Sequence, residues 1–322
     1  MTKEAITRNA LIGQAVGDAF GVPVEFLPRS TVRAINLLEM TGADSEEPPD
    51  SRWGTIIPKG SWSDDTSMTV ASMASFVSCG GPDYEDQMRQ FTRWWDGGAY
   101  CCLAYPFGLG GNISAAMARF RRGVPALECG GRQIMDNGNG ALMRILPFSL
   151  YCIFRELGPE ETVTVSGNGS AITHGHEISR LCCFVWTEFL RALLSGRNVG
   201  GAIAAIEDLP YQRWFSETAT SAVSFVTEGK IRDLRQADIG ETGYVVDSLY
   251  AALYSMIRGH DYESTIRTAV SLGYDTDTNA AITGTAAGIL YGIEDIPARW
   301  LSVLRGRPLL DDTAQRFAAC FA

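Results

Sequence analysis

Histidine, charge and long apolar runs are all scarce in this chain of 322 residues. It contains three His, and charged residues make up 20% of the sequence. A zinc site needs further His or Cys at suitable spacing, and a nucleophilic triad needs a Ser or Cys paired with a base, so neither chemistry is indicated. The nearest approach to an apolar run of about 18 residues, at 181–194, is interrupted by Glu188 and Arg191. We therefore expect no membrane span.

Cysteine is present without a recognisable pattern. The eight Cys include two adjacent pairs, at 101–102 and 182–183, in apolar surroundings, and no CxxC occurs. Such residues are typical of buried free thiols rather than of disulfides or soft-metal sites. The first residues also lack the apolar run of a secretory signal. These features predict a cytoplasmic protein in a reducing environment.

The charge balance is acidic. The formal net charge is −10, whereas a nucleic-acid-binding surface is basic, so we expect no nucleic-acid partner. A hydrophobic fraction of 46% with seven Trp allows a large core, and the chain is predicted to fold rather than to remain disordered.

Apolar residues recur at helical spacing along most of the chain, and long alternating runs typical of strands are missing. The first case is Ala5 to Phe20, where the spacing is close to 3.6 residues. Further helices are predicted at 67–77, 84–95, 113–122, 141–154, 177–194, 199–206, 215–227, 242–256, 262–271, 278–291, 297–304 and 312–321. No clear domain boundary or long repeat is found, so the sequence predicts one all-α, compact multi-helix domain over residues 1–322.

The most irregular segment is 42–59, which is rich in Pro, Asp and Glu. It reads as a mobile loop just before the first of two acidic motifs. Its place suits a lid over a site, although a plain surface excursion has the same composition.

The two acidic motifs are the most informative feature of the chain. They are Ser-Asp-Asp-Thr at 63–66 and Asp-Thr-Asp-Thr at 275–278, and each leads into an apolar helical stretch. A helix cap explains one short polar residue, but each motif has four. Carboxylate and hydroxyl oxygens also suit Mg²⁺ or Mn²⁺. Spacing alone supports caps and metal ligands equally; if the fold brings the motifs together, a two-metal hydrolytic site results.

Other segments allow both a functional and an ordinary interpretation. The glycine-rich stretches 106–112 and 136–140 precede helical runs and can offer backbone N–H groups to a phosphate, but ordinary turns look the same. Neither matches a P-loop or a dinucleotide-binding fingerprint. His174 and His176 fit hydrogen-bonded loop residues better than metal ligands. Glu25 lies among apolar neighbours, so it is either a solvated loop acid or a desolvated acid–base group of raised pKa.

Taken in order, these segments resemble the ADP-ribosylglycohydrolase family, which includes the dinitrogen-reductase-activating glycohydrolases. The resemblance rests on Gly13–Ala19 with Glu25, Trp62–Thr66, Asn137–Arg144, Thr173–His174 and Gly273–Ala281. It covers nearly the whole chain. Its specific elements are the two acidic motifs, and the glycine segments add weight by their order.

The resemblance implies an all-α fold with a binuclear Mg²⁺ or Mn²⁺ centre. It implies metal ligation by Ser63, Asp64 and Asp65 from one side and by Asp275, Asp277 and Thr278 from the other, and a catalytic set of Glu25, Asp64, Asp65 and Asp277. It implies substrate contacts for Gly110, Gly111, Asn137, Gly138, Asn139, Gly140, His174 and Tyr274. Glu25 matches an acid that helps to protonate or position the substrate in some members.

The implied reaction hydrolyses the bond between C1″ of ADP-ribose and an acceptor, commonly an arginine of a modified protein, and releases ADP-ribose. A hydrolase of another ADP-ribose linkage (Ser-linked, O-acetyl or polymeric) and a non-catalytic module that binds ADP-ribose are the alternatives. The chain departs from the family pattern in the stretch 109–113, where the polar residue commonly found after the glycines is shifted, and at two motif positions. Ser63 stands where Thr is commoner, and Tyr274 stands where a second Gly is usual, so we expect Tyr274 to reshape the cleft.

Overall fold

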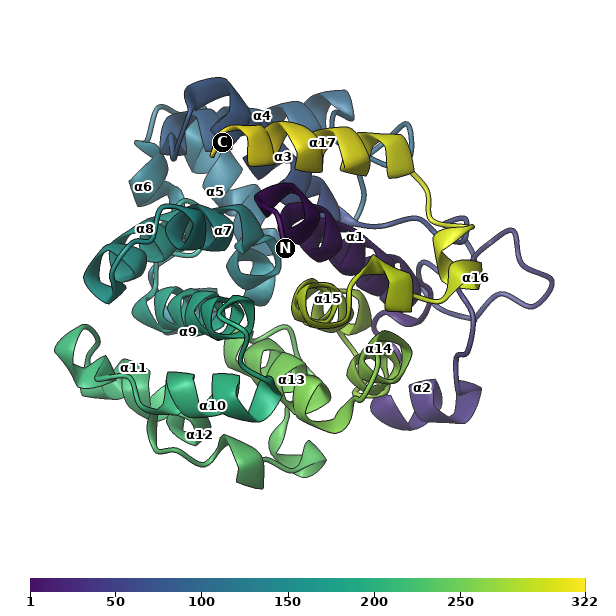
Figure 1. The fold of residues 1–322 in the computed structure, drawn as a ribbon. Coiled ribbons are helices and arrows are strands. Elements are labelled where there is room, and N and C mark those ends of the chain that lie inside the picture. The colour runs from purple at the N-terminus through teal and green to yellow at the C-terminus, as the bar shows by residue number, and fades with distance from the viewer. Residues whose placement is uncertain (322) are drawn as a thin grey trace.

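Helices carry the regular structure of this computed structural model, which describes residues 1–321 (Figure 1). The α-helices are α1 Lys3–Gly21, α2 Arg29–Ile35, α3 Asp64–Cys79, α4 Tyr84–Gly97, α5 Gly111–Arg121, α6 Ala126–Cys129, α7 Leu146–Phe154, α8 Pro159–Ala171, α9 Glu177–Leu194, α10 Val199–Glu207, α11 Glu217–Ala222, α12 Ser224–Thr227, α13 Val245–Arg258, α14 Tyr262–Val270, α15 Thr276–Tyr291, α16 Ala298–Leu301 and α17 Arg307–Ala319. Short 3-10 turns include η1 Val22–Val24, η2 Ile134–Asp136 and η3 Asn139–Arg144. The described residues contain two isolated β-bridges but no strand, so the all-α prediction is confirmed.

Helices α1 and α15 pack against each other at the centre of the molecule, with α14 and α13 against α15 and α17 across α1 (Figure 1). Their backbones touch through glycines. An added Cβ at Gly17 would lie 2.1 Å from the carbonyl oxygen of Ala280, and one at Gly13 would lie 2.3 Å from that of Gly284. Because no side chain fits between the helices, this contact fixes how α15 lies on α1.

Both acidic motifs lie at helix N-termini. Ser63 is the N-cap of α3, and Asp275 directly precedes the first residue of α15. Carboxylates at these ends face the positive side of the helix dipole. The hydroxyl of Ser63 caps α3 by accepting from the N–H of Asp65, whereas the side chain of Asp275 makes no capping bond to α15. The cap interpretation therefore holds for the first motif, and what the additional acids do depends on their surroundings.

Some predicted helices differ from those in the structure. The helix expected at 141–154 is divided into the 3-10 turn η3 and α7, whose second residue is Pro147. Because proline has no N–H to donate to the preceding turn, it begins a new helix there. The helix expected at 215–227 is likewise divided into α11 and α12.

No helix is predicted from the sequence at 159–171, where the structure contains α8 with Gly167 and Gly169. These glycines allow close packing, because a Cβ at Gly169 would lie 2.8 Å from the ring of Phe148 and one at Gly167 would lie 2.9 Å from Nε of Arg180. Tertiary contact thus overrides the low helix propensity of glycine.

The segment 42–59 is irregular, as expected, but both of its ends are tied down. The backbone N–H of Ala43 donates to the Ile57 carbonyl, and the N–H of Lys59 donates to the Asp44 carboxylate. Ile57 forms a small apolar cluster with Val22 and Phe107, against which Trp53 packs. This cluster holds the loop beside the end of α1.

No single helix among the described residues is long and apolar enough to cross a membrane. One bent pair, Lys3–Val24 with Arg29–Ile35, passes on length and composition together, at an angle of 101°.

Candidate functional site

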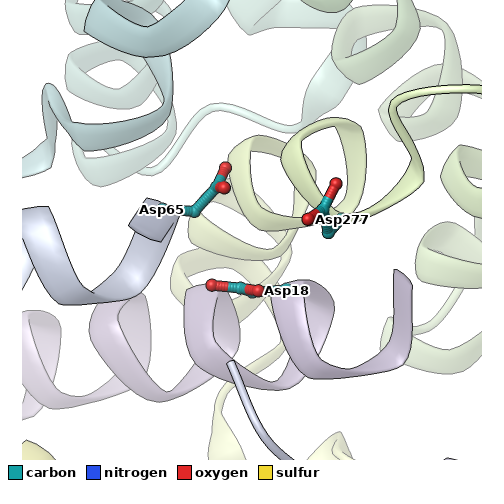
Figure 2. A group of neighbouring side chains, drawn as sticks. All are labelled: Asp18, Asp65 and Asp277. Atoms are coloured by element: carbon teal, nitrogen blue, oxygen red, sulfur yellow. The ribbon is translucent and has the colours of Figure 1, made fainter. Parts of the chain in front are cut away.

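The fold brings the two acidic motifs together. The hydroxyl of Thr278 on α15 donates to Oδ2 of Asp65 on α3 at 3.4 Å. Figure 2 shows Asp65 and Asp277 facing a common space with Asp18, which lies on α1. Carboxylate oxygens of these three residues lie within 4.8 Å of one another, and so do oxygens of Glu25, Asp275 and Asp277. Asp277 belongs to both groups and therefore joins them.

Asp18 organises the first turn of α3. One of its carboxylate oxygens accepts from the N–H of Ser63 at 2.9 Å, and the other accepts from the N–H and hydroxyl of Thr66 at 3.1 and 2.7 Å. The Ser63 hydroxyl in turn donates to Oδ2 of Asp65 at 3.0 Å. Sequence reasoning assigned no role to Asp18. Its signal is an acid within the apolar stretch of α1, where a solvated carboxylate has no place.

The side-chain amide of Asn139 holds the second acidic motif in place. Nδ2 of Asn139 donates to Oδ2 of Asp275 at 2.7 Å and to the Ser248 hydroxyl at 2.9 Å. The backbone N–H of Thr278 donates to Oδ1 of Asp277 at 2.9 Å. Asn139 therefore sets the direction of one carboxylate, and the start of α15 sets the other.

Two residues in left-handed conformation hold Glu25 beside the second acidic motif. Phe26 and Tyr274 have φ values of 66° and 60°. The N–H of Phe26 donates to the Tyr274 carbonyl at 2.6 Å, the N–H of Tyr274 donates to the Leu27 carbonyl at 2.8 Å, and the two rings meet edge to face at 5.6 Å. Non-glycine residues rarely adopt this conformation, and it persists where surrounding contacts enforce it.

Burial and mutual repulsion raise the pKa values of the acids at this site. Burial raises the pKa of Asp64 to about 8, with the charges of Asp18 and Asp275 adding to the rise, and burial raises the pKa of Asp18 to about 6. The pKa values of Asp65, Asp277 and Glu25 are also raised, first by burial and then by neighbouring carboxylates. The Trp53 side chain beside Glu25 opposes part of its rise.

None of these carboxylates forms an ion pair with a Lys, Arg or His among the described residues. Among the described residues, Oδ1 of Asp65 and Oε2 of Glu25 are buried without a hydrogen-bond partner. Buried charge without compensation is costly, so this arrangement fits a site completed by cations. Carboxylate and hydroxyl donors are those that Mg²⁺ and Mn²⁺ prefer.

A cavity of about 270 Å³ opens onto the acids. It is lined by Glu25, Phe26, Asp64, Gly108, Gly110, Gly111, Asn112, Ile113, Gly138, Asn139, Gly140, Met143, His174, Asp275, Asp277 and Thr278. Gly108 has φ +91°, and a Cβ there would lie 2.2 Å from Oδ1 of Asp64. The glycine therefore leaves room for that carboxylate at the cavity wall.

Most of the residues singled out in the sequence line this cavity, and four do not. Asp65 and Ser63 are buried beside it, with Asp65 in the acidic group. Asn137 is turned away: its side chain accepts from the N–H and hydroxyl of Ser179 and donates to the Ile134 carbonyl. Tyr274 contacts Phe26, and it is Phe26 that lines the cavity.

Comparison with known proteins agrees with this geometry. A family model, ADP-ribosylglycohydrolase, matches residues 2–322. The chain is 28% identical over 96% of its length to the ADP-ribosylarginine hydrolase Tri1 of Serratia proteamaculans (strain 568), of which 78% is covered. It is 27% identical to the ADP-ribosyl-[dinitrogen reductase] glycohydrolase of Rhodospirillum rubrum, with 92% of this chain and 89% of the relative covered.

A solved structure described as an ADP-ribosylglycohydrolase-related protein complex superimposes on 99% of each chain, with a TM-score of 0.76 and 28% identity. The match in sequence extends over nearly the whole chain and includes both acidic motifs. The chain belongs to the ADP-ribosylglycohydrolase family.

Proposed function

We propose that the chain is a metal-dependent hydrolase that removes ADP-ribose from arginine residues of a modified protein. The observation that carries this proposal is that buried carboxylates from Glu25, the start of α3 and the start of α15 line one cavity, with Asp18 of α1 beside them. The names of two relatives supply the substrate class: one is an ADP-ribosylarginine hydrolase and the other a glycohydrolase of ADP-ribosylated dinitrogen reductase.

Two divalent cations, Mg²⁺ or Mn²⁺, are proposed as the cofactors. Ligands would come from both motifs: Ser63, Asp64 and Asp65 at the start of α3, and Asp275, Asp277 and Thr278 at the start of α15. Asp18 is assigned to positioning, because its two oxygens already accept three hydrogen bonds from the first turn of α3. Bound cations of this kind lower the pKa of a water ligand and stabilise developing negative charge.

The reaction breaks the C1″–N bond of the modified arginine. The oxygen of a water molecule bonds to C1″ as the C1″–N bond breaks. The proton of the Glu25 carboxyl goes to the departing nitrogen, and the proton that the water loses returns to the Glu25 carboxylate. We assign this role to Glu25 because it lines the cavity and because burial, with the charges of Asp275 and Asp64, raises the pKa of its carboxyl. The surrounding carboxylates also stabilise positive charge that develops at C1″, and they favour a cationic guanidinium acceptor.

The test is a release assay on three defined substrates that carry arginine-, serine- or O-acetyl-linked ADP-ribose, each with Mg²⁺, with Mn²⁺ and with a chelator. We expect release from the arginine linkage with metal and loss of release on chelation. Full activity with chelator would overturn metal dependence. Release from another linkage alone would identify a hydrolase of different specificity, and binding of ADP-ribose with no release from any substrate would identify a binding module.

A further inference from the structure

Arg144 is a buried cation that the proposed reaction does not use. It ends η3 and has no exposed surface. Nη1 donates to the Gly169 carbonyl at 3.0 Å, and the guanidinium lies 5.0 Å from the centre of the Phe91 ring. Burial lowers its pKa to about 10, so it remains charged at neutral pH. A buried cation without a carboxylate partner is costly, so the other hydrogen bond of Arg144, to Thr173, is important for holding it.

That contact leads to the cavity through Thr173. Nη2 of Arg144 donates to Oγ1 of Thr173 at 2.6 Å, and the same hydroxyl lies 2.9 Å from Nδ1 of His174. An arginine N–H can only donate, so the Thr173 oxygen accepts there and has its own proton to place. Nδ1 of His174 is the acceptor that the described contacts offer. The ring proton of His174 is then on Nε2.

Nε2 of His174 faces the glycine-lined wall of the cavity. An added Cβ at Gly138 would lie 3.3 Å from Nε2, and one at Gly140 would lie 2.9 Å from Cε1 of the same ring. No hydrogen bond from Nε2 to another described residue is found. The N-terminal residues of α5, Gly111 and Asn112, line the cavity as well. This wall therefore presents N–H groups to an oxygen of a ligand.

We propose that Arg144 and Thr173 are positioning residues that hold His174 as a neutral Nε2–H donor to an oxygen of the ADP-ribose diphosphate. The ligand in this statement rests on the proposed function, whereas the tautomer does not. The neutral state has a physical cause: burial and the nearby charge of Arg144 lower the pKa of His174 to about 3. The ring therefore stays a donor on the same nitrogen across the neutral pH range.

The tautomer can be measured directly by NMR. The chain has three His, so protein labelled with ¹⁵N-histidine gives three ring systems in a long-range ¹H–¹⁵N correlation spectrum, and His174→Gln identifies the relevant one. We expect the Nε2–H form in the unmodified protein. Thr173→Val keeps the shape but removes the hydroxyl, and we expect it to populate the Nδ1–H form as well. Thr173→Ser should restore the original spectrum.

Affinity provides a second measurement. With saturating Mg²⁺ or Mn²⁺, we expect Thr173→Val to weaken binding of ADP-ribose about tenfold in calorimetry, the loss of one well-oriented hydrogen bond. Thr173→Ser should stay within about twofold. Thr285→Val is the matched control, because that buried hydroxyl bonds only the Ala281 carbonyl within α15, and it should change neither spectrum nor affinity.

Two results would overturn the proposal: an Nδ1–H tautomer of His174 in the unmodified protein, or a Thr173→Val protein with unchanged spectrum and affinity. Failure of the unmodified protein to bind ADP-ribose is a different outcome. It would contradict the proposed function, while the spectrum would still decide whether Arg144 and Thr173 fix the ring.

Discussion

The acidic end of the cavity differs from its glycine-lined end in how the polar groups are satisfied. The acidic end comprises Glu25, Asp64, Asp275 and Asp277, and the glycine-lined end comprises Gly138, Gly140 and His174. At the acidic end, the carboxylates are buried with raised pKa values, and among the described residues none forms an ion pair, although the charge of Arg52 opposes part of the rise at Glu25. At the other end, the ring of His174 is neutral and tied through Thr173 to Arg144. In our proposal cations complete the acidic end, whereas the chain itself completes the other end, so changes at the two ends should affect different steps.

Asp277→Asn should have the largest effect, because this residue belongs to both acidic groups. We expect turnover to fall by about 10³-fold or more, since metal sites contribute several kcal/mol to charge stabilisation. The thermal midpoint of the metal-free protein should not fall, because the substitution removes a buried carboxyl whose ionisation is disfavoured by burial and by neighbouring acids. Release assays and circular dichroism measure the two quantities. Asp312→Asn, in an exposed pair with Arg316, is the control. Activity near that of the unmodified protein would remove the acidic end from the chemistry.

Glu25→Gln keeps the size of the side chain and removes its transferable proton. We expect kcat to fall by about 10²-fold while the dissociation constant of ADP-ribose changes little. The split between the two constants is the informative result. Equal loss of binding and turnover would mean that Glu25 holds the ligand rather than acting on the bond.

Gly140→Ala tests the other end of the cavity. The added methyl would meet Cε1 of His174 and Cδ1 of Ile113 at 2.9 Å, so one of them must move. We expect affinity for ADP-ribose to fall about tenfold, a loss of the size usual for an overpacked contact. The metal-induced rise in thermal midpoint should be unchanged. A smaller metal response would show that the two ends are coupled.

Stability of the metal-free protein should depend on pH in a direction set by the acids. The pKa of Asp64 is raised from 3.8 to about 8 and that of Asp18 from 3.8 to about 6. Between pH 3.8 and about 8, the folded state therefore binds more protons than the unfolded state. The free energy of unfolding falls as pH rises through this range. His174 has the opposite effect below pH 6.5. There the unfolded state binds a proton at this residue and the folded state does not, so stability falls as pH decreases.

Divalent cations should consequently raise the thermal midpoint more at pH 8 than at pH 6.5, by a few degrees. Binding to the folded state adds stability by mass action, and deprotonated ligands bind more strongly. Differential scanning fluorimetry with Mg²⁺, Mn²⁺ and chelator measures this shift. A metal response independent of pH would contradict the raised pKa values.

Tyr274→Gly should have the smallest effect. Glycine relieves a left-handed conformation that costs about 1–2 kcal/mol, but it also removes a ring contact worth about 0.5–1.5 kcal/mol. We expect the free energy of unfolding to change by less than about 1 kcal/mol and turnover by less than about threefold. Urea denaturation and comparison of linkages would show whether this ring influences substrate choice through Phe26.

Local sequence signals predicted much of the fold. The helix predicted at 177–194 is α9 with the same bounds, because a long amphipathic pattern follows a capping residue. By contrast, α8 was missed, since its glycines are stabilised by contacts with Phe148 and Arg180 that lie elsewhere in the chain.

The candidate site shows the same division. Both acidic motifs could be found from their composition, and the family resemblance indicated a shared site. The role of Asp18 could not be found, because it depends on how α1 lies beside the first turn of α3. Asn137 points away from the cavity, and Phe26 rather than Tyr274 lines it; both outcomes also depend on tertiary packing.

Glycine also brings the end of α1 against the backbone of Asp277. At Gly21, an added Cβ would lie 2.4 Å from Cα of Asp277, so the backbone that carries this acid rests directly on α1. The backbone of Asp277 therefore cannot move closer to α1, and moving it away would separate the two central helices. Flexible coordination suits the larger Ca²⁺, whereas Mg²⁺ demands short, regular distances. We therefore expect that close packing of the two backbones, which limits the movement of Asp277, would be tolerated better by a small divalent ion than by Ca²⁺.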